Sequence, residues 1–374
     1  FTMQKKIIAL AVAGLVSGVA FAQTNVTVYG AIDVAYVNKS DAIRGDKINS
    51  GIGGHFANTG AYSDNAYNAI DTNGYDASWF GLKGTEDLGN GLTASFQAEM
   101  GILPDNQNAA TQQRSTFVQL EGKNWGSIKA GNYFIDTVLF NTKGGFDNAG
   151  MSEKAIRIGA NTWANNAIRY ATPSWGGLQA SVGYSSNFTF GQDDQQTQEG
   201  NNRTWFGDVT YSNGPLFVGA TYSNFGKGGD SKTDGHEWNI GAAYDFKVVN
   251  VGLVYDSIRF NSMGFDWINT NSFIGDDDLD RDTWRLNVGV PITAKDSVYM
   301  SYANVHSKYH ADGDSDKFSQ NAFGVGYKHN LSKRTSVYAQ AYFVDADDLA
   351  FMNFKQQSGE TLQNGYQVGM RHTF

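Results

Sequence analysis

Apolar and polar residues alternate one by one along many short stretches of this chain. The run Gly365–Phe374 is typical, because its large apolar residues and one histidine recur at every second position. These residues are Tyr366, Val368, Met370, His372 and Phe374. Successive side chains of a β-strand point to opposite faces, so the run predicts a strand with one apolar and one polar face. Soluble β-sandwiches and membrane barrels with a wet interior both contain such strands.

The alternation returns along the whole chain after residue 22, and helical 3.6-residue spacing is not sustained there. Clear examples lie at 26–36, 92–99, 178–185 and 284–290. Aromatic residues gather near the ends of such stretches, where membrane barrels carry their interfacial girdles. Packing in a soluble core would not explain why the opposite face is polar in strand after strand. The pattern therefore predicts an all-β fold and favours a transmembrane barrel.

Two kinds of connection separate the predicted strands. Seven are short and carry turn residues, as in Asp87–Gly91 and Asn213–Pro215. Eight long loops are predicted at about 39–75, 101–113, 135–165, 189–202, 226–235, 261–281, 307–317 and 345–363. Together these connections join sixteen strands. Short periplasmic turns and long extracellular loops between an even number of antiparallel strands are typical of outer-membrane barrels.

Residues 1–22 read as a secretory signal peptide. Two lysines precede the apolar stretch 7–19, and the small-residue motif Ala20–Ala22 follows. The apolar stretch is shorter than the ~20 residues that a transmembrane helix needs. We expect the signal peptide to be removed, which leaves residues 23–374 as a single barrel domain. Two extra residues stand before Met3 and have no place in this pattern.

Composition limits the alternatives further. Glycine is abundant, at 44 residues, while proline is rare, at 4, which suits long strands and flexible loops. Cysteine is absent, so disulfides and thiolate metal sites are excluded. Without the two signal-peptide lysines, 26 basic residues stand against 37 acidic ones, a net charge of −11. This acidic balance argues against nucleic acid as a partner.

Five stretches in order along the chain resemble the general diffusion porins of Gram-negative bacteria, most closely the betaproteobacterial type. They are VTVYGAIDVAYV at 26–37, SWFGLKGTEDLGNGLTASFQAE at 78–99, IRYATPSWGGLQASVGYS at 168–185, LSKRTSVYAQAYF at 331–343 and the C-terminal run. The resemblance implies a homotrimer of sixteen-stranded antiparallel barrels in the outer membrane, exported through the periplasm. It also implies that the third long loop folds into the lumen and that small hydrophilic solutes and ions diffuse through passively.

The resemblance further implies contacts with outer-membrane lipid, lipopolysaccharide and the barrel-assembly machinery. The last strand, with Tyr366 and Phe374, would be the signal that this machinery reads. One position departs from the family pattern. The family motif S-R-x-G-x-K-G has an arginine that lines the constriction, and this chain has Trp79 there. An aromatic ring at this place narrows the pore and removes a positive charge.

Charged rings and pore diameter decide selectivity in channels. Strand phase points several basic side chains toward the lumen, and Arg114 matches the basic residue of a family motif. With Trp79, the candidate wall residues are Lys83, Arg114, Lys129, Arg169 and Arg285. The inserted loop, 135–165, contributes the candidates Lys143, Asp147, Glu153 and Arg157. Its acids Asp147 and Glu153 are expected to face the basic wall. Because the loop regions are acidic and the wall is basic, the sign of the ion preference stays open.

No cofactor is expected and no metal site is predicted. The stretch Asp312–Asp316 lacks the Gly and Glu that an EF-hand needs at positions 6 and 12. Acids there and at 276–282 could still hold a divalent cation loosely. His306 and His310 are four residues apart, but they fall where strand changes into loop rather than on a helix.

Two other functions are open at this point. A substrate-selective channel for a sugar or small organic acid would use Trp79 with Phe134, Phe140 and Phe146 as a track of aromatic rings. A barrel enzyme, such as a protease or phospholipase, would need Ser, His and an acid clustered at one rim. The sequence contains no such cluster with a recognisable spacing.

Overall fold

The computed structural model describes residues 26–44, 67–72, 74–105, 112–135, 138, 141–142, 163–186, 203–226, 234–262, 278–311, 314–346 and 360–374. The predicted signal peptide lies outside these residues, so it stays a prediction. Within the described ranges, no helix is both long enough and apolar enough to cross a membrane.

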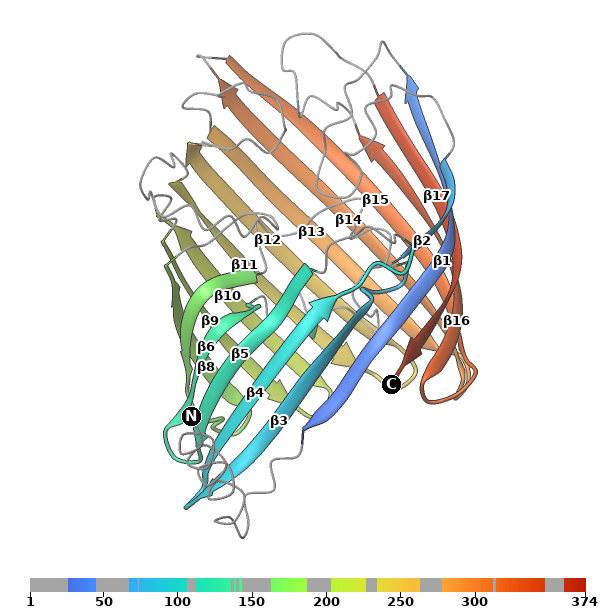
Figure 1. Cartoon of the computed structure of the whole chain (residues 1–374). Helices are drawn as coiled ribbons and strands as arrows, with labels where there is room; N and C mark the ends of the chain where they lie inside the picture. The colour runs from blue at the N-terminus through green and yellow to red at the C-terminus, as the bar shows by residue number, and fades with distance from the viewer. Residues whose placement is uncertain are drawn as a thin grey trace, which may run out of the picture.

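Seventeen strands account for most of the described chain and form one antiparallel sheet (Figure 1). They are β1 (Thr27–Arg44), β2 (Tyr67–Thr72), β3 (Trp79–Gly89), β4 (Leu92–Gly101), β5 (Gln112–Gly122), β6 (Gly126–Phe134), β7 (Trp163–Ala171), β8 (Leu178–Ser185), β9 (Thr204–Asn213), β10 (Leu216–Phe225), β11 (Asp234–Asp245), β12 (Asn250–Ser262), β13 (Asp278–Pro291), β14 (Asp296–Ala311), β15 (Asp314–Asn330), β16 (Thr335–Ala346) and β17 (Glu360–Thr373). Because β17 pairs with β1, the sheet closes into a barrel.

The seventeen strands occupy sixteen positions around the barrel. On one side of β1, β2 pairs with the half from Val34 to Lys39, and β3 pairs with the half from Thr27 to Ala31. The two short strands are thus two pieces of one barrel strand, interrupted between Thr72 and Trp79. The predicted sixteen-stranded antiparallel barrel is therefore confirmed.

Alternating side chains face two different environments. In β1, Ala31, Asp33 and Ala35 are buried on the lumen side, while Ile32 and Tyr36 are exposed on the outside. The last strand follows the same rule, with Tyr366 and Phe374 exposed outside. Apolar surface that is exposed around a closed barrel suits contact with hydrocarbon, because lipid covers it. The alternation along the sequence thus reflects the two environments of each strand, lipid on the outside and the polar lumen on the inside.

Aromatic rings form two belts on the outer face. Near the long-loop end, Tyr184 contacts Trp205, with ring centroids 4.7 Å apart, and Tyr255 contacts Trp284 at 4.5 Å. Near the short-turn end lie outward-facing Tyr211, Tyr244 and Tyr327 on β9, β11 and β15. Tyr and Trp prefer membrane–water interfaces, so the two belts mark the edges of the membrane-spanning band.

The turn chemistry of the sequence is realised at the short connections. Gly89, Asn90 and Gly91 all have positive φ, as does Gly214. Glycine and asparagine adopt this left-handed conformation at low cost, which lets two strands join through few residues.

The predicted long loop at 307–317 is wrong. In the structure β14 continues to Ala311, β15 begins at Asp314, and the two strands stay paired up to these residues. Both faces of a strand can be polar once it extends beyond the hydrocarbon, so the alternation fades although the strand continues. His306 and His310 accordingly lie within β14.

Candidate pore lining and constriction

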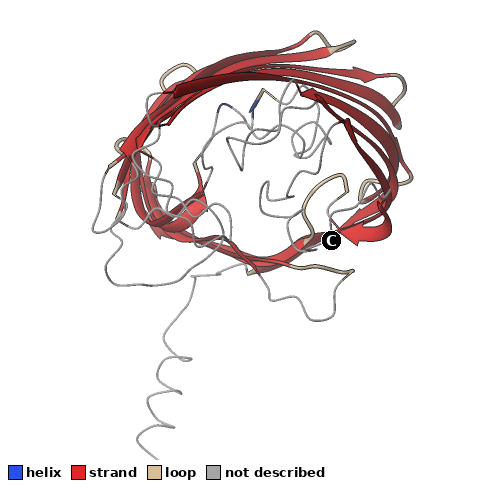
Figure 2. Ribbon diagram, turned by 90° about the horizontal axis from the view of Figure 1, so that it is seen from above, coloured by secondary structure: helices blue, strands red, loops and turns tan. Residues whose placement is uncertain are grey.

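The segment between β6 and β7, called loop 3 below, enters the barrel directly after β6. Of its described residues, Ile135, Val138 and Thr142 are buried, and Asn141 is exposed. The side-chain amide of Asn287 on β13 donates to the carbonyl oxygen of Thr142 at 2.9 Å. Seen along the barrel axis, the short helical piece of this segment lies inside the ring of strands (Figure 2). The start of loop 3 thus packs on the lumen side of the wall.

Three glycines on neighbouring strands receive the start of loop 3. A methyl group on Gly241 of β11 would lie 2.8 Å from the side chains of Val138 and Thr142, and one on Gly219 of β10 would lie 2.9 Å from Val138. On β12, a methyl group on Gly252 would lie 1.9 Å from the carbonyl oxygen of Thr142. Any larger residue would therefore displace the loop, and we call these three positions the glycine seat.

Arg285 lies on the wall beside loop 3 rather than on an open surface. It precedes Asn287 by one inward-facing position on β13, and only 3 % of its surface is exposed. The loop candidates Lys143, Asp147, Glu153 and Arg157 lie outside the described residues, as do Phe140 and Phe146. The expected meeting of loop acids with wall cations therefore stays a prediction.

On the wall formed by β1, β3, β4 and β5, aromatic rings and charges form one connected cluster. The rings of Tyr29 and Trp79 meet edge to face, with centroids 4.9 Å apart. The hydroxyl of Tyr29 donates to Glu99 at 2.8 Å, and the guanidinium of Arg114 lies 3.5 Å from the same carboxylate. Arg114 also lies over the Trp79 ring, 5.7 Å from its centroid, and the ammonium of Lys83 lies 4.4 Å from the centroid of Tyr29.

Arg114 reaches the lumen through an irregularity in β5. Ala98 of β4 pairs with Thr116, whereas Met100 pairs with Gln113, so β5 carries one extra residue in this interval. An extra residue in a strand shifts the side-chain phase by one position and turns the following side chains to the other face. Simple alternation from Val118 would have placed Arg114 outside.

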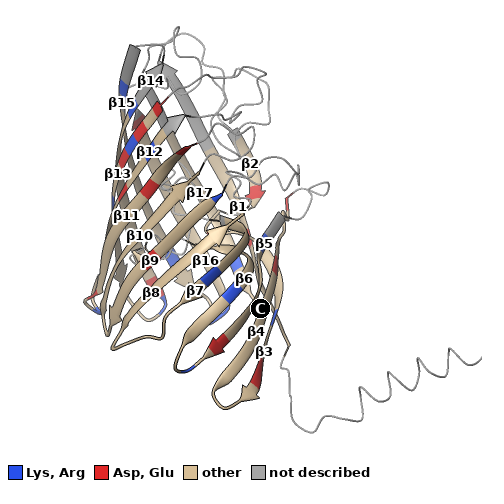
Figure 3. Ribbon diagram, turned by 90° about the vertical axis from the view of Figure 1, so that its left-hand side faces the viewer, with Lys and Arg blue, Asp and Glu red and all other residues tan. Residues whose placement is uncertain are grey.

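A second set of charged groups lies on β6 to β9. Lys129 and Arg169 are direct neighbours across the β6–β7 pairing. The ammonium of Lys129 lies 4.3 Å from the ring centroid of Phe117, while Arg169 forms an ion pair with Asp208 and donates to Ser181 at 2.8 Å. Figure 3 shows this pair of strands with blue, basic segments on both β6 and β7.

The structure brings four of the predicted wall cations to one continuous arc from β3 to β9. Lys83 and Lys129 have no carboxylate partner among the described residues, whereas Arg114 and Arg169 each pair with one. Aromatic rings lie beneath three of these cations, an arrangement that stabilises a positive charge without neutralising it. Phe134 lies half-buried at the end of β6 rather than beside Trp79.

Sequence reasoning missed one inward-facing segment, residues 74–78 between β2 and β3. It was assigned in part to an extracellular loop, but Gly74, Tyr75 and Ser78 are buried inside the barrel. The break in alternation at this point was the available signal.

Acids that were candidates for a loosely held cation lie on strands instead. Asp280 and Asp282 belong to β13, where both contact Arg259, at 3.4 and 2.9 Å. Within the ranges that the structure covers, no group of three or more His, Asp or Glu could hold a metal ion. A cation at the other loop acids stays a prediction, since Asp276 and Asp277 lie outside those ranges.

Comparison with known proteins agrees with this architecture. The profile of the Gram-negative porin family matches residues 9–349. Outer membrane porin protein 32 of Delftia acidovorans is 33% identical over 403 residues and covers 100% of both chains. An outer membrane porin protein of Bordetella pertussis is 28% identical over 410 residues, with the same full coverage.

Solved structures show the same fold. The anion-selective porin from Comamonas acidovorans superposes with a TM-score of 0.68 at 26% identity, covering 94% of this chain and 100% of that one. A Salmonella typhi OmpF complexed with daunomycin matches with a TM-score of 0.64 at 17% identity, covering 94% and 98%, which supports the fold alone. These relatives are porins, which are channels without enzymatic activity, so the barrel-enzyme alternative is not supported. The chain belongs to the Gram-negative porin family and forms an outer-membrane barrel through which ions and small hydrophilic solutes diffuse.

Proposed function

We propose that this porin conducts anions in modest preference to cations, along the arc of wall from β3 to β9. The observation that carries the proposal is the pair of lysines, Lys83 and Lys129, that lack a carboxylate partner among the described residues. A row of fixed positive charges beside a narrow path attracts anions and repels cations. The related Comamonas protein is described as anion-selective, in agreement with this sign.

Two features make the preference modest. Trp79 stands where the family has an arginine, so one cation is missing from the arc. The carboxylate of Glu99 lies 3.5 Å from Arg114 and offsets the positive charge of its guanidinium. We therefore expect a smaller anion preference than in a porin with an arginine at position 79.

The reversal potential of the reconstituted channel tests the proposal. In a tenfold KCl gradient across a planar bilayer, the sign of the zero-current potential reports which ion crosses more readily. We expect the sign of an anion-selective pore, and a smaller value at high salt, because the Debye length falls from about 10 Å at 0.1 M to about 3 Å at 1 M. A cation-selective reversal potential at low salt would overturn the proposal.

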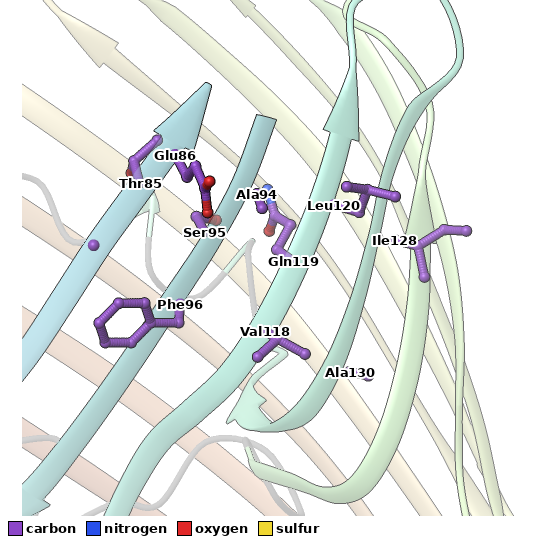
Figure 4. Close-up of a pocket in the computed structure, with 11 residues that line it drawn as sticks. Thr85, Glu86, Ala94, Ser95, Phe96, Val118, Gln119, Leu120, Ile128 and Ala130 are labelled. Atoms are coloured by element: carbon purple, nitrogen blue, oxygen red, sulfur yellow. The ribbon is translucent and has the colours of Figure 1, made fainter. Parts of the chain in front are cut away.

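We also propose that the barrel assembles as a homotrimer through the outer face of β3 to β6. No Tyr or Trp occupies an outward position on the described parts of these four strands, unlike the belts elsewhere. A concavity of about 460 Å³ lies here, and its lining includes the exposed side chains of Val118, Leu120 and Ile128 (Figure 4). Apart from Trp125 in the turn after β5, whose ring lies against Gly122, this face lacks the interfacial Tyr and Trp residues of the belts, and such a face suits contact with protein better than contact with lipid.

The trimer proposal is tested by paired substitutions on two outer faces. Val118→Gln on β5 should lower the temperature at which the trimer dissociates in detergent. Val209→Gln on β9, which is similarly exposed outside, should leave it unchanged. Equal effects of the two changes, or a monomeric wild-type protein in mild detergent, would contradict this interface.

For the outer rim, we propose contact with lipopolysaccharide. Lys308 and Lys317 are directly opposed on β14 and β15, beyond the aromatic belt near the long-loop end, and Lys317 is exposed. Two opposed ammonium groups repel each other, and phosphate from an anionic glycolipid would relieve that repulsion. Lys317→Gln should reduce the lipopolysaccharide that copurifies with the trimer.

The outward pair Tyr366 and Phe374 supports the proposal of a C-terminal assembly signal. The backbone of Phe374 is paired with Gly30 through hydrogen bonds of 3.1 and 3.2 Å, so it takes part in barrel closure. Phe374→Ala should slow assembly by the barrel-assembly machinery, measured as accumulation of the unfolded form on heat-modifiability gels. Normal assembly kinetics of this variant would contradict the assignment.

A further inference from the structure

Residues 74–78 interrupt a barrel strand and turn into the lumen. The strands on either side of them, β2 and β3, both pair with β1, so the chain leaves the wall and returns to it within a few residues. Gly74 allows a close approach, since a methyl group there would lie 2.6 Å from the Cβ atom of Ala35 and 2.3 Å from the hydroxyl of Tyr338. The segment therefore lies in direct contact with the inner surface of the wall.

Hydrogen bonds from several strands hold the backbone of this segment. The carbonyl oxygen of Gly74 accepts from Gln340 of β16 at 2.9 Å and also from Gln367 of β17. The amide of Tyr75 donates to the carboxylate of Asp33 on β1 at 3.1 Å. Three buried polar side chains thus form hydrogen bonds with the segment, which is the arrangement expected of a specific, persistent contact.

The ring of Tyr75 packs among lumen-facing side chains of three other strands, β14, β15 and β16. Its centroid lies 5.3 Å from that of Tyr338 and 5.9 Å from that of Tyr299. The ammonium of Lys328 donates to the Tyr75 hydroxyl at 3.0 Å. Only 1 % of the Tyr75 surface is exposed, so the ring is an anchor rather than a mobile lining residue.

A charged side chain of β17 also holds the segment, on the side that is less buried. Arg371 of β17 donates to the carboxylate of Asp76 at 2.9 Å and to the carbonyl oxygen of Ala77 at 3.3 Å. Asp76 and Ala77 are only partly buried, unlike their neighbours. These two residues therefore form the surface that the segment presents to the open lumen.

We propose that residues 74–78 are a second constriction element of the pore. The described start of loop 3 packs on β10 to β13, and this segment packs on β14 to β17 and on β1. Among the described residues, most of the arc from β3 to β9 is covered by neither of these two pieces, and this arc carries four of the predicted wall cations. The segment narrows the path from the side facing away from this arc and directs permeating ions along it. The proposal rests on the channel function of the family.

Single cysteines test the proposal, because the natural chain has none. Ala77→Cys keeps the contact between Asp76 and Arg371, and its thiol should react with small hydrophilic methanethiosulfonates in the open channel. We expect the single-channel current to fall by about 20 to 50 %, since added volume at a narrow point reduces conductance. The fall should occur with both a negatively charged sulfonate and a positively charged trimethylammonium reagent, because the effect is steric.

Controls make the result decisive. Ala294→Cys, in the exposed short turn between β13 and β14, should be labelled by the same reagents and leave the current unchanged. Asp76→Cys serves as a second site if Ala77→Cys fails to give the heat-modifiable folded form. Complete labelling confirmed by mass spectrometry without a fall in current, or no labelling in a folded channel, would overturn the proposal. The reversal potential of the unlabelled protein reports on anion preference separately, so the two proposals fail independently.

Discussion

Two walls of the lumen, β10–β13 and β3–β9, share the same antiparallel geometry but differ in the size and charge of their inward side chains. The first has the glycine seat, where Gly219, Gly241 and Gly252 leave room for the start of loop 3. The second has Lys83 and Lys129 over aromatic rings. Small inward residues allow a wall to be covered, whereas large charged and aromatic ones keep it open and polar. These inward side chains support the conducting path proposed along β3 to β9.

Filling the glycine seat should break this division most strongly. Gly252→Val would place side-chain atoms where the Thr142 carbonyl oxygen lies, so loop 3 must move off its wall. We expect a change in single-channel conductance of about twofold, with added current noise. Ala242→Val, which faces outward beside Gly241, is the matched control and should conduct normally. An unaltered conductance for folded Gly252→Val would show that the seat does not position loop 3.

Restoring a cation to the open wall should give the next largest effect. Trp79→Arg places a guanidinium beside Arg114 and Lys83 and should raise the anion-to-cation permeability ratio by about two- to fivefold. Trp79→Phe keeps a ring without adding charge and serves as the control. Equal reversal potentials for the two variants would mean that position 79 does not face the narrow part of the path.

Removing a cation from the same arc should move selectivity in the opposite direction. Lys129→Gln eliminates one of the two lysines that lack a carboxylate partner among the described residues, and should lower the permeability ratio by about 1.5- to 2-fold. Lys123→Gln, in the exposed turn after β5, is the control and should have little effect. The difference between the two should shrink at 1 M salt, because screening weakens the field of a fixed charge.

The smallest effect is expected from releasing Arg114. Glu99→Gln removes the carboxylate that lies beside its guanidinium and should raise the permeability ratio by less than about 1.5-fold. Tyr29→Phe removes only the hydrogen bond to Glu99 and should leave the ratio unchanged. A shift toward cations in Glu99→Gln would contradict the assigned geometry of this cluster.

Much of the fold was predictable because the membrane imposes a period of two on every spanning strand. The inward placement of Lys83, Lys129 and Arg169 follows from that period alone. The position of Arg114 does not, since an extra residue in β5 shifts the phase. The strand ends of β14 and β15 were missed for a related reason, because beyond the hydrocarbon both faces are polar.

Alternation along the chain by itself determined that this protein is a barrel with lipid outside and a polar lumen inside, since each strand has one apolar face for the lipid and one polar face for the lumen. Only the tertiary structure decided which walls are covered. The glycine seat lies on β10 to β12, and the residues that hold Tyr75 come from β1 and from β14 to β16, strands far from it in sequence. Such contacts form only when the barrel closes, so no local sequence pattern predicts them.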